Sequence, residues 1–158
     1  MSLKEYNKKR DFTKTSEPYG VESLSSDTLR FVIQKHEATR LHFDLRLEMG
    51  GCFKSWAVPK GLTQNPAEQR LAVFVEDHPI EYGSFEGIIP QGNYGAGTVM
   101  LHDYGVYEDR KNPEDSEQSL IRGLAKGQIS FVLYGKRHKG EFILIKSDGK
   151  NWLLMKWP

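Results

Sequence analysis

Polar and apolar residues alternate without a break between residues 40 and 48. Leucine or phenylalanine fills every second position there, and the positions between them are all polar: Arg40, His42, Asp44, Arg46 and Glu48. Successive side chains of a β-strand point to opposite faces, so this spacing predicts a strand with one buried apolar face and one polar face. The polar face would carry an imidazole, a carboxylate and a guanidinium in one row.

Further short apolar segments follow, separated by turn-forming residues. The predicted strands cover residues 28–34, 40–48, 52–58, 71–76, 98–102 with a continuation over 104–109, 128–134, 141–147 and 152–157. Gly-rich turns after residue 48, at 135–140 and at 148–151 are typical of hairpins. The predicted helix is short and covers residues 117–126. About eight strands with little helix indicate an all-β fold, either an antiparallel barrel or a sandwich, and we expect the barrel.

Residues 1–27 differ from the rest because they show no sustained helical or strand period. A terminal position favours disorder, whereas Phe12 and Tyr19 could dock the segment on the body of the protein. We therefore predict an N-terminal arm over residues 1–27 that packs on a single β-barrel domain over residues 28–158.

Chain length, net charge and cysteine count limit the kinds of protein that this chain can be. The 158 residues suit one domain, and 22 basic against 21 acidic residues leave a net charge of +1. A nucleic-acid-binding role would therefore need a local basic patch. The single cysteine, Cys52, excludes an internal disulfide, and no run of about 18 apolar residues appears. We expect a soluble cytoplasmic monomer.

The polar row of the 40–48 strand is a candidate metal site. His42 and Asp44 would lie roughly 6–7 Å apart on one face, and His36 could supply a third ligand from just upstream. Imidazole and carboxylate ligands favour Mn, Fe, Co or Zn over Ca or Mg. Arg46, next in the row, is suited to grip phosphate or carboxylate. The alternative is a solvated strand face without chemistry.

Three other segments carry candidate functional residues. His78 ends a predicted strand before Pro79, where functional loops are often held, although an exposed surface histidine is the alternative. The Gly-rich stretch 86–97 has neither the phosphate-loop nor the dinucleotide spacing, so we interpret it as a tight loop packed by Tyr94 near the site. The basic turn at 135–140 could touch a phosphate backbone or be a solvated hairpin tip.

Four motifs occur in one order along the chain: Q-K-H-E-A-T-R-L-H-F-D-L-R-L-E, K-S-W-A-V-P-K-G, V-E-D-H-P-I-E-Y and F-E-G-I-I-P-Q-G-N-Y-G-A-G. Together they resemble the 3′-phosphoesterase domain of bacterial ATP-dependent ligase D, in its free-standing form. The resemblance implies a β-barrel with a crescent-shaped groove. It also implies a manganese-dependent enzyme that removes a 3′-terminal ribonucleoside and then the remaining 3′-phosphate.

The resemblance implies a biological setting as well. The product is a 3′-hydroxyl, so the role would be healing of DNA or RNA 3′ ends before ligation in double-strand break repair by non-homologous end joining. Its partners would be primer-template 3′ ends and a separate DNA ligase, with no membrane. Mn²⁺ would be the cofactor, with Co²⁺ or Zn²⁺ as other candidates.

Site residues follow from the same resemblance, position by position. The metal ligands would be His36, His42 and Asp44. The scissile phosphate would contact Arg46 and His78, with Tyr82 beside them. A larger set would bind substrate: Arg10, Asp11, Glu17, Gln34, Lys60, Arg70 and Glu76. Of these, Arg10, Asp11 and Glu17 would support diester cleavage more than monoester cleavage.

Some alternatives stay open at this stage. His42 and Asp44 with His78 downstream also fit the facial triad of non-haem iron oxygenases. A non-catalytic nucleic-acid-binding barrel with a structural metal is a second alternative. For the phosphoesterase itself, His78 could either donate a proton to the leaving oxygen or hold the phosphate.

Overall fold

A closed antiparallel barrel forms the body of the protein. The computed structural model describes residues 3–21 and 28–158. The sheet has the order β1-β2-β3-β4-β9-β8-β7-β6-β5, and an additional pairing of β1 with β6 closes it. The closed part consists of β1 (Leu29–Glu37), β2 (Leu41–Met49), β3 (Cys52–Val58), β4 (Arg70–His78), β6 (Gly97–Asp109), β7 (Gln128–Tyr134), β8 (Lys139–Asp148) and β9 (Asn151–Lys156). The predicted all-β barrel is confirmed.

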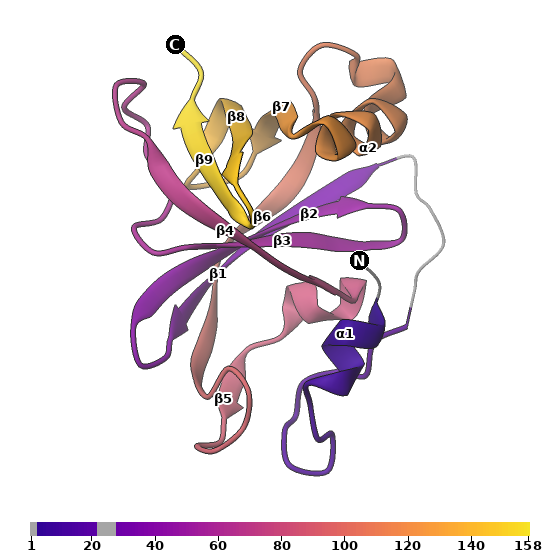
Figure 1. Cartoon of the computed structure of the whole chain (residues 1–158), viewed down its shortest axis with the longest axis vertical. Coiled ribbons are helices and arrows are strands. Elements are labelled where there is room, and N and C mark those ends of the chain that lie inside the picture. Colours follow the sequence, from indigo (N-terminus) through magenta and orange to yellow (C-terminus); the bar gives the residue numbers. More distant parts are fainter. Residues whose placement is uncertain (1–2, 22–27) are drawn as a thin grey trace.

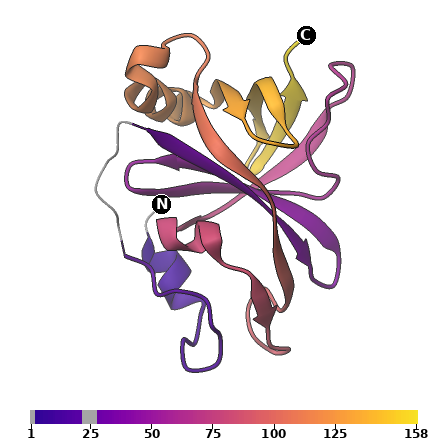
Figure 2. The ribbon, with the colours of Figure 1, turned by 180° about the vertical axis from the view of Figure 1, so that it is seen from behind.

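Helices and a short strand lie at the two ends of the barrel. In Figure 1, α2 (Ser116–Lys126) lies near β7 to β9 at the top. The reverse view in Figure 2 shows the opposite end, where the other short elements gather: α1 (Leu3–Lys8), the 3-10 helix η1 (Ile80–Ser84) and β5 (Gly87–Ile89). A second 3-10 turn, η2 (Pro113–Asp115), precedes α2. Within the described ranges no helix has the length and apolar character needed to cross a membrane.

Most predicted elements occur where expected, whereas α1, β5 and the 3-10 turns η1 and η2 were not predicted. The helix at 117–126 and the hairpin turns are present, and β6 runs through Gly105 as one strand. No helix was predicted near the N-terminus, because the sequence shows no sustained period there. The presence of α1 shows that this prediction was wrong. That helix has only six residues, too few for a period to stand out, and it relies on burial of Leu3 and Tyr6. β5, with three residues, was also missed.

Two apolar clusters explain how the arm attaches. The barrel interior is filled by side chains such as Phe31, Leu45 and Trp56. A second cluster outside it joins Leu3 and Tyr6 of α1 to residues of η1, β5 and β6. Arm residues 3–21 are therefore held against the barrel by burial of aromatic side chains. The predicted arm boundary at residue 27 lies in 22–27, outside the described residues.

The polar row on β2 is buried rather than solvated. Asp44, Arg46 and Glu48 are 7%, 3% and 1% exposed. Glu48 is neutralised by Arg30, with the Nε to Oε1 distance at 2.8 Å. Buried charges need partners, and the alternative of a plain solvated face is wrong for this part of β2.

Candidate active site

The three predicted metal ligands, His36, His42 and Asp44, converge in space. β1 and β2 pair so that His36 lies opposite His42, and Asp44 follows on the same face of β2. Their potential ligand atoms all lie within 4.8 Å of one another. Two ligands each about 2.1 Å from one ion can be up to about 4.2 Å apart. A small side-chain adjustment would therefore place all three around one ion.

Hydrogen bonds outside the triad orient both imidazoles. His36 Nε2 donates to the carbonyl of Gly95 at 2.8 Å, which leaves Nδ1 facing Asp44 Oδ2 at 3.6 Å. His42 Nδ1 donates to the carbonyl of Arg40 at 3.2 Å, which leaves Nε2 facing Asp44 Oδ1 at 3.3 Å. In its neutral form each ring therefore turns the nitrogen with the lone pair toward the position of a shared ion, the arrangement typical of metal-ligating histidines. Two imidazoles and one carboxylate fit a divalent transition metal.

The electrostatics of the triad favour a cation between these ligands. Burial alone would raise the pKa of Asp44, but the Arg46 guanidinium, together with hydrogen bonds from the two histidines when their rings are protonated, holds it well below its usual range. Burial opposes a charge on His42, yet its hydrogen bond and proximity to Asp44 raise its pKa above the ordinary value. The carboxylate therefore stays ionised and attracts positive charge, either a proton on His42 or a metal ion.

Arg46 lies beside the triad with one nitrogen unused. Its Nε donates to Gln34 Oε1 at 2.7 Å, and its Nη2 lies 3.5 Å from Asp44 Oδ2. The Tyr82 ring covers the guanidinium, with the ring centroid 4.8 Å from Cζ. Arg46 Nη1 is buried and has no hydrogen-bond partner among the described residues. A buried donor without a partner is costly, and an anionic oxygen would satisfy it.

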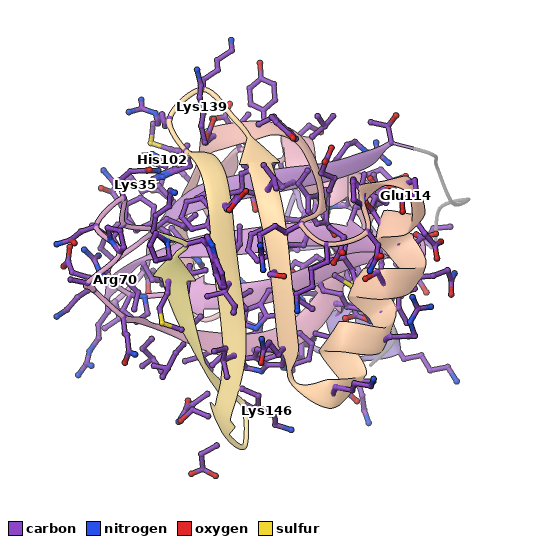
Figure 3. The ribbon with its side chains drawn as sticks, turned by 90° about the horizontal axis from the view of Figure 1, so that it is seen from above. Lys35, Arg70, His102, Glu114, Lys139 and Lys146 are labelled. Atoms are coloured by element: carbon purple, nitrogen blue, oxygen red, sulfur yellow. The ribbon has the colours of Figure 1, made fainter. Side chains whose placement is uncertain are left out.

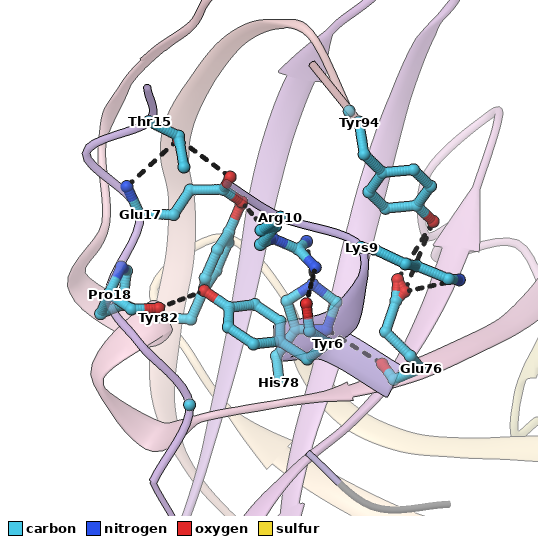
Figure 4. Close-up of polar contacts among 12 residues, drawn as sticks. Tyr6, Lys9, Arg10, Thr15, Glu17, Pro18, Glu76, His78, Tyr82 and Tyr94 are labelled. Carbon is cyan, nitrogen blue, oxygen red and sulfur yellow. Dashed lines mark hydrogen bonds and ion pairs between the residues drawn. The ribbon is translucent and has the colours of Figure 1, made fainter. Parts of the chain in front are cut away.

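The N-terminal arm supplies a second guanidinium. Figure 4 shows Arg10 between Glu17 and His78, with Tyr82 to one side of it and its hydroxyl at Glu17. Glu17 accepts hydrogen bonds from Arg10 Nε at 2.9 Å and from the Tyr82 hydroxyl at 2.7 Å. Arg10 also lies over the Tyr6 ring at 3.9 Å. Glu17 therefore fixes the position of both Arg10 and Tyr82.

His78 is held in one neutral form. Its Nδ1 donates to the carbonyl of Glu76 at 3.0 Å, so Nε2 carries the lone pair and accepts from Arg10 Nη2 at 3.4 Å. Burial, with the charges of Arg46 and Arg10, lowers the pKa of His78 well below its ordinary value. At neutral pH the ring therefore has no proton on the nitrogen that faces Arg10.

These groups line one cavity of about 290 Å³. Its polar lining comprises Arg10, His36, His42, Asp44, Arg46, Glu76, His78, Tyr82 and Tyr94. Glu76 accepts a hydrogen bond from the Tyr94 hydroxyl at 3.1 Å and pairs with Lys9 at 3.4 Å. The cavity thus joins a cation-binding triad to two guanidinium groups, the arrangement expected for a bound phosphoester.

Other predicted site residues lie outside this cavity. Gln34 and Glu17 lie behind Arg46 and Arg10 and contact them. Asp11 is exposed and accepts from the backbone of Thr13 at 3.0 Å. Lys60 is exposed, and Arg70 donates to the Lys60 carbonyl at 2.6 Å. The geometry brings neither Lys60 nor Arg70 to the metal triad.

Two contacts were not anticipated from the sequence. The Gly95 carbonyl orients His36, although the glycine-rich loop had been expected near the site only through Tyr94. Tyr6 supports Arg10 through ring stacking. A backbone carbonyl carries no sequence signal of its own, and Tyr6 lies in a segment without a period.

Comparison with known proteins places the chain in a family. Residues 34–146 match the family described as DNA Ligase D 3′-phosphoesterase domain. The chain belongs to this family. It is 48% identical over 160 aligned positions to the multifunctional non-homologous end joining protein LigD of Pseudomonas aeruginosa, covering 98% of this chain and 18% of that protein. The LigD protein of Mycolicibacterium smegmatis is 46% identical, covering 96% of this chain and 20% of that protein.

A further relative is the non-homologous end joining DNA repair protein LigD of Mycobacterium tuberculosis, 42% identical over 96% of this chain and 19% of that protein. The chain thus spans about a fifth of the length of the curated relatives it matches. Membership in this family makes the chain a hydrolase of phosphoric esters.

Proposed function

We propose that this protein is a Mn²⁺-dependent enzyme that heals 3′ ends of DNA and RNA. It removes a 3′-terminal ribonucleoside as a phosphodiesterase, and then removes the remaining phosphate as a phosphomonoesterase. The product is a 3′-hydroxyl that a DNA ligase of an end-joining pathway can use. The family and its LigD relatives support the 3′ end as the substrate.

One observation supports the phosphoester substrate above the others. Arg46 Nη1 is a buried donor without a partner, and its guanidinium is 3.5 Å from the carboxylate of the metal triad. A phosphate oxygen beside the metal would accept from this nitrogen. The iron oxygenase alternative is weaker because its expected ligand, His78, faces Arg10 while His36 joins the triad.

The metal and the protein divide the chemistry between them. When bound by His36, His42 and Asp44, a divalent cation would polarise the phosphate and lower the pKa of a water molecule. Arg46 holds the remaining phosphate oxygens and offsets the charge that grows in the transition state. Gly95 and Arg40 keep the ligand rings in the orientation that leaves their lone pairs toward the ion.

His78 acts first as a hydrogen-bond acceptor in this proposal. Its neutral ring has no proton on Nε2, so it cannot donate from that atom in the resting state. An anionic ester near Arg10 and Arg46 would offset their charge and raise the pKa of His78. Protonated in that state, the ring can hold the phosphate or protonate the leaving oxygen, which is the 5′-oxygen of the ribonucleoside in the diester step and the 3′-oxygen of the remaining strand in the monoester step.

Diester cleavage depends on the arm more than monoester cleavage does in this proposal. A diester carries a second sugar that must be placed, and Arg10 is the cationic side chain that the arm adds to the cavity. Glu17 keeps Arg10 in place with a buried ion pair of 2.9 Å. The monoester has one ester link and depends on the metal triad and Arg46.

A single assay tests the proposed function. The purified chain is incubated with a 3′-phosphorylated oligonucleotide and with one ending in a single ribonucleotide, with Mn²⁺ and with a chelator. We expect phosphate and nucleoside release only with Mn²⁺, and loss of both activities in Asp44→Ala with the fold retained. Asp148→Ala, a change of the same kind at an exposed site of β8, is the matched control. Metal-dependent oxygen uptake without phosphate release would overturn the proposal.

A further inference from the structure

A group of basic side chains lies on the opposite side of β1 from the metal triad. Lys35 directly precedes His36, and neighbouring side chains of a strand point to opposite faces. Lys35 pairs in register with Phe43, and the Phe43 ring contacts His102 with centroids 5.0 Å apart. We name the surface formed by Lys35, His102, Arg137, His138 and Lys139 the basic face.

The 135–140 turn, which carries three of these five residues, is held in a fixed shape. The buried carboxylate of Asp103 accepts hydrogen bonds from three successive backbone N–H groups, those of Lys136, Arg137 and His138, at 2.9, 3.2 and 2.8 Å. Gly135 is required, because an added Cβ would lie 2.3 Å from the Asp103 carboxylate. The 135–140 turn therefore presents its side chains at little cost in backbone entropy.

Positive charge dominates the basic face. Arg137 and Lys139 are exposed and Lys35 is partly so. Burial lowers the pKa of His102, and the nearby charges of Arg137 and Lys35 lower it further. Of the acidic groups close by, Asp103 is 3% exposed and occupied by the turn, while Glu37 lies 4.0 Å from Lys35. Exposed pairs at that distance contribute little.

Figure 3 shows the placement from above. His102 and Lys35 lie next to each other at the side of the barrel, with Lys139 above them. Lys146, on the same strand as Lys139, lies at the opposite end of the view. Seven residues of extended strand separate these two lysines by roughly 23 Å. The chain therefore offers a matched pair of basic sites on one strand.

We propose that the basic face binds the phosphate backbone of the double helix that precedes the 3′ end. This inference rests on the proposed function, because the metal cavity on the other side of β1 must receive that end. A single strand leaving the cavity has one row of phosphates. A duplex adds a second row across a minor groove about 6 Å wide, and the proposal places this second row on the far side of β1. Lysine and arginine contacts to phosphates are independent of sequence.

Binding of uncleavable hairpin duplexes with a recessed 3′-hydroxyl tests the basic face without Mn²⁺ and without turnover. A long stem of about 12 base pairs extends roughly 41 Å from the end, at 3.4 Å per pair. The double variant Lys35→Gln with Arg137→Gln should bind the long stem about tenfold more weakly. The negative slope of log affinity against log salt should become shallower by about 1.8, because two phosphate contacts are lost.

The matched control removes two charges elsewhere. Lys126→Gln with Lys146→Gln changes exposed residues at the far end of β8 and the adjoining helix, and its affinity and salt slope should equal those of the wild type. The long stem should also shift the side-chain NMR signals of His102, whereas a single strand with the same 3′ end should leave them in place. Equal loss in both variants, or a His102 signal that the long stem leaves unmoved, would overturn the inference.

The two proposals fail in different ways. A wild-type chain that binds the long stem through the basic face but releases no phosphate with Mn²⁺ would disprove the proposed function. A chain that releases phosphate from 3′ ends, while the Lys35 and Arg137 changes leave duplex binding intact, would disprove the basic face alone. In that second case the surface would be free to serve a protein partner instead.

Discussion

Gln34 Oε1 accepts a hydrogen bond from Arg46 Nε at 2.7 Å, and this contact sets the plane of the guanidinium in the cavity. The same amide donates to the carbonyls of Tyr82 and Phe85 at 2.7 and 3.1 Å. Gln34 is fully buried. It therefore connects β1, β2 and the η1 segment, and it positions Arg46 without touching the metal triad.

Gln34→Leu should lower kcat for both esters by about 10- to 100-fold. The substitution removes the hydrogen bonds of Gln34 to the Tyr82 and Phe85 carbonyls and leaves the buried Arg46 Nε without its acceptor, which corresponds to roughly 1–3 kcal/mol. Mn²⁺ affinity, measured by calorimetry, should stay unchanged because Gln34 is not a ligand. Gln64→Leu at an exposed position is the control. A loss of metal affinity in Gln34→Leu would contradict the positioning role.

Arg46→Ala should reduce both activities by about 100- to 1,000-fold, in line with removal of one donor that stabilises transition-state charge. Mn²⁺ binding at neutral pH should be retained or tightened, because a positive charge next to Asp44 disappears. Parallel measurement of turnover and Mn²⁺ affinity checks this prediction. Weaker Mn²⁺ binding would mean that Arg46 supports the metal rather than the phosphate.

Glu17→Ala should impair diester cleavage more than monoester cleavage. The change releases Arg10 and Tyr82, which Glu17 holds at 2.9 and 2.7 Å. The rate of diester cleavage divided by the rate of monoester cleavage, measured on matched 3′-ribonucleotide and 3′-phosphate substrates, should fall by about tenfold. This corresponds to roughly 1.4 kcal/mol. Glu5→Ala, an exposed glutamate of the same arm, should leave the ratio unchanged. Equal losses for both substrates would remove the arm from this role.

Mn²⁺ affinity and activity should fall together as the pH drops through the pKa of His42, which lies above the ordinary histidine value of about 6.5. The pKa of the metal-free His42 is raised by Asp44, so a proton competes with the metal as the pH drops through that value. Asp44 stays ionised throughout because its pKa is lowered. One competing proton reduces the apparent affinity by about tenfold per pH unit. Full activity at pH 5 would contradict this prediction.

Local sequence patterns predict most strands of the barrel and their hairpin turns. The period of two along β2 predicts both the strand and the shared face of His42 and Asp44, because neighbouring side chains alternate whatever the rest of the chain does. Paired Gly residues after Met49 likewise predict the β2–β3 hairpin. Short elements such as α1 and β5 were missed, because their stability comes from contacts with distant segments.

The sequence by itself determined the strands of the barrel and the parity that gathers His42, Asp44 and Arg46. The tertiary structure decided which of these side chains are buried and what they face. Closure of β1 against β6 and the docking of the arm are contacts between distant residues, and local periodicity does not encode them. Only the folded chain brings Glu17 to Arg10, Gln34 to Arg46 and Gly95 to His36, because each of these contacts depends on how separate segments pack.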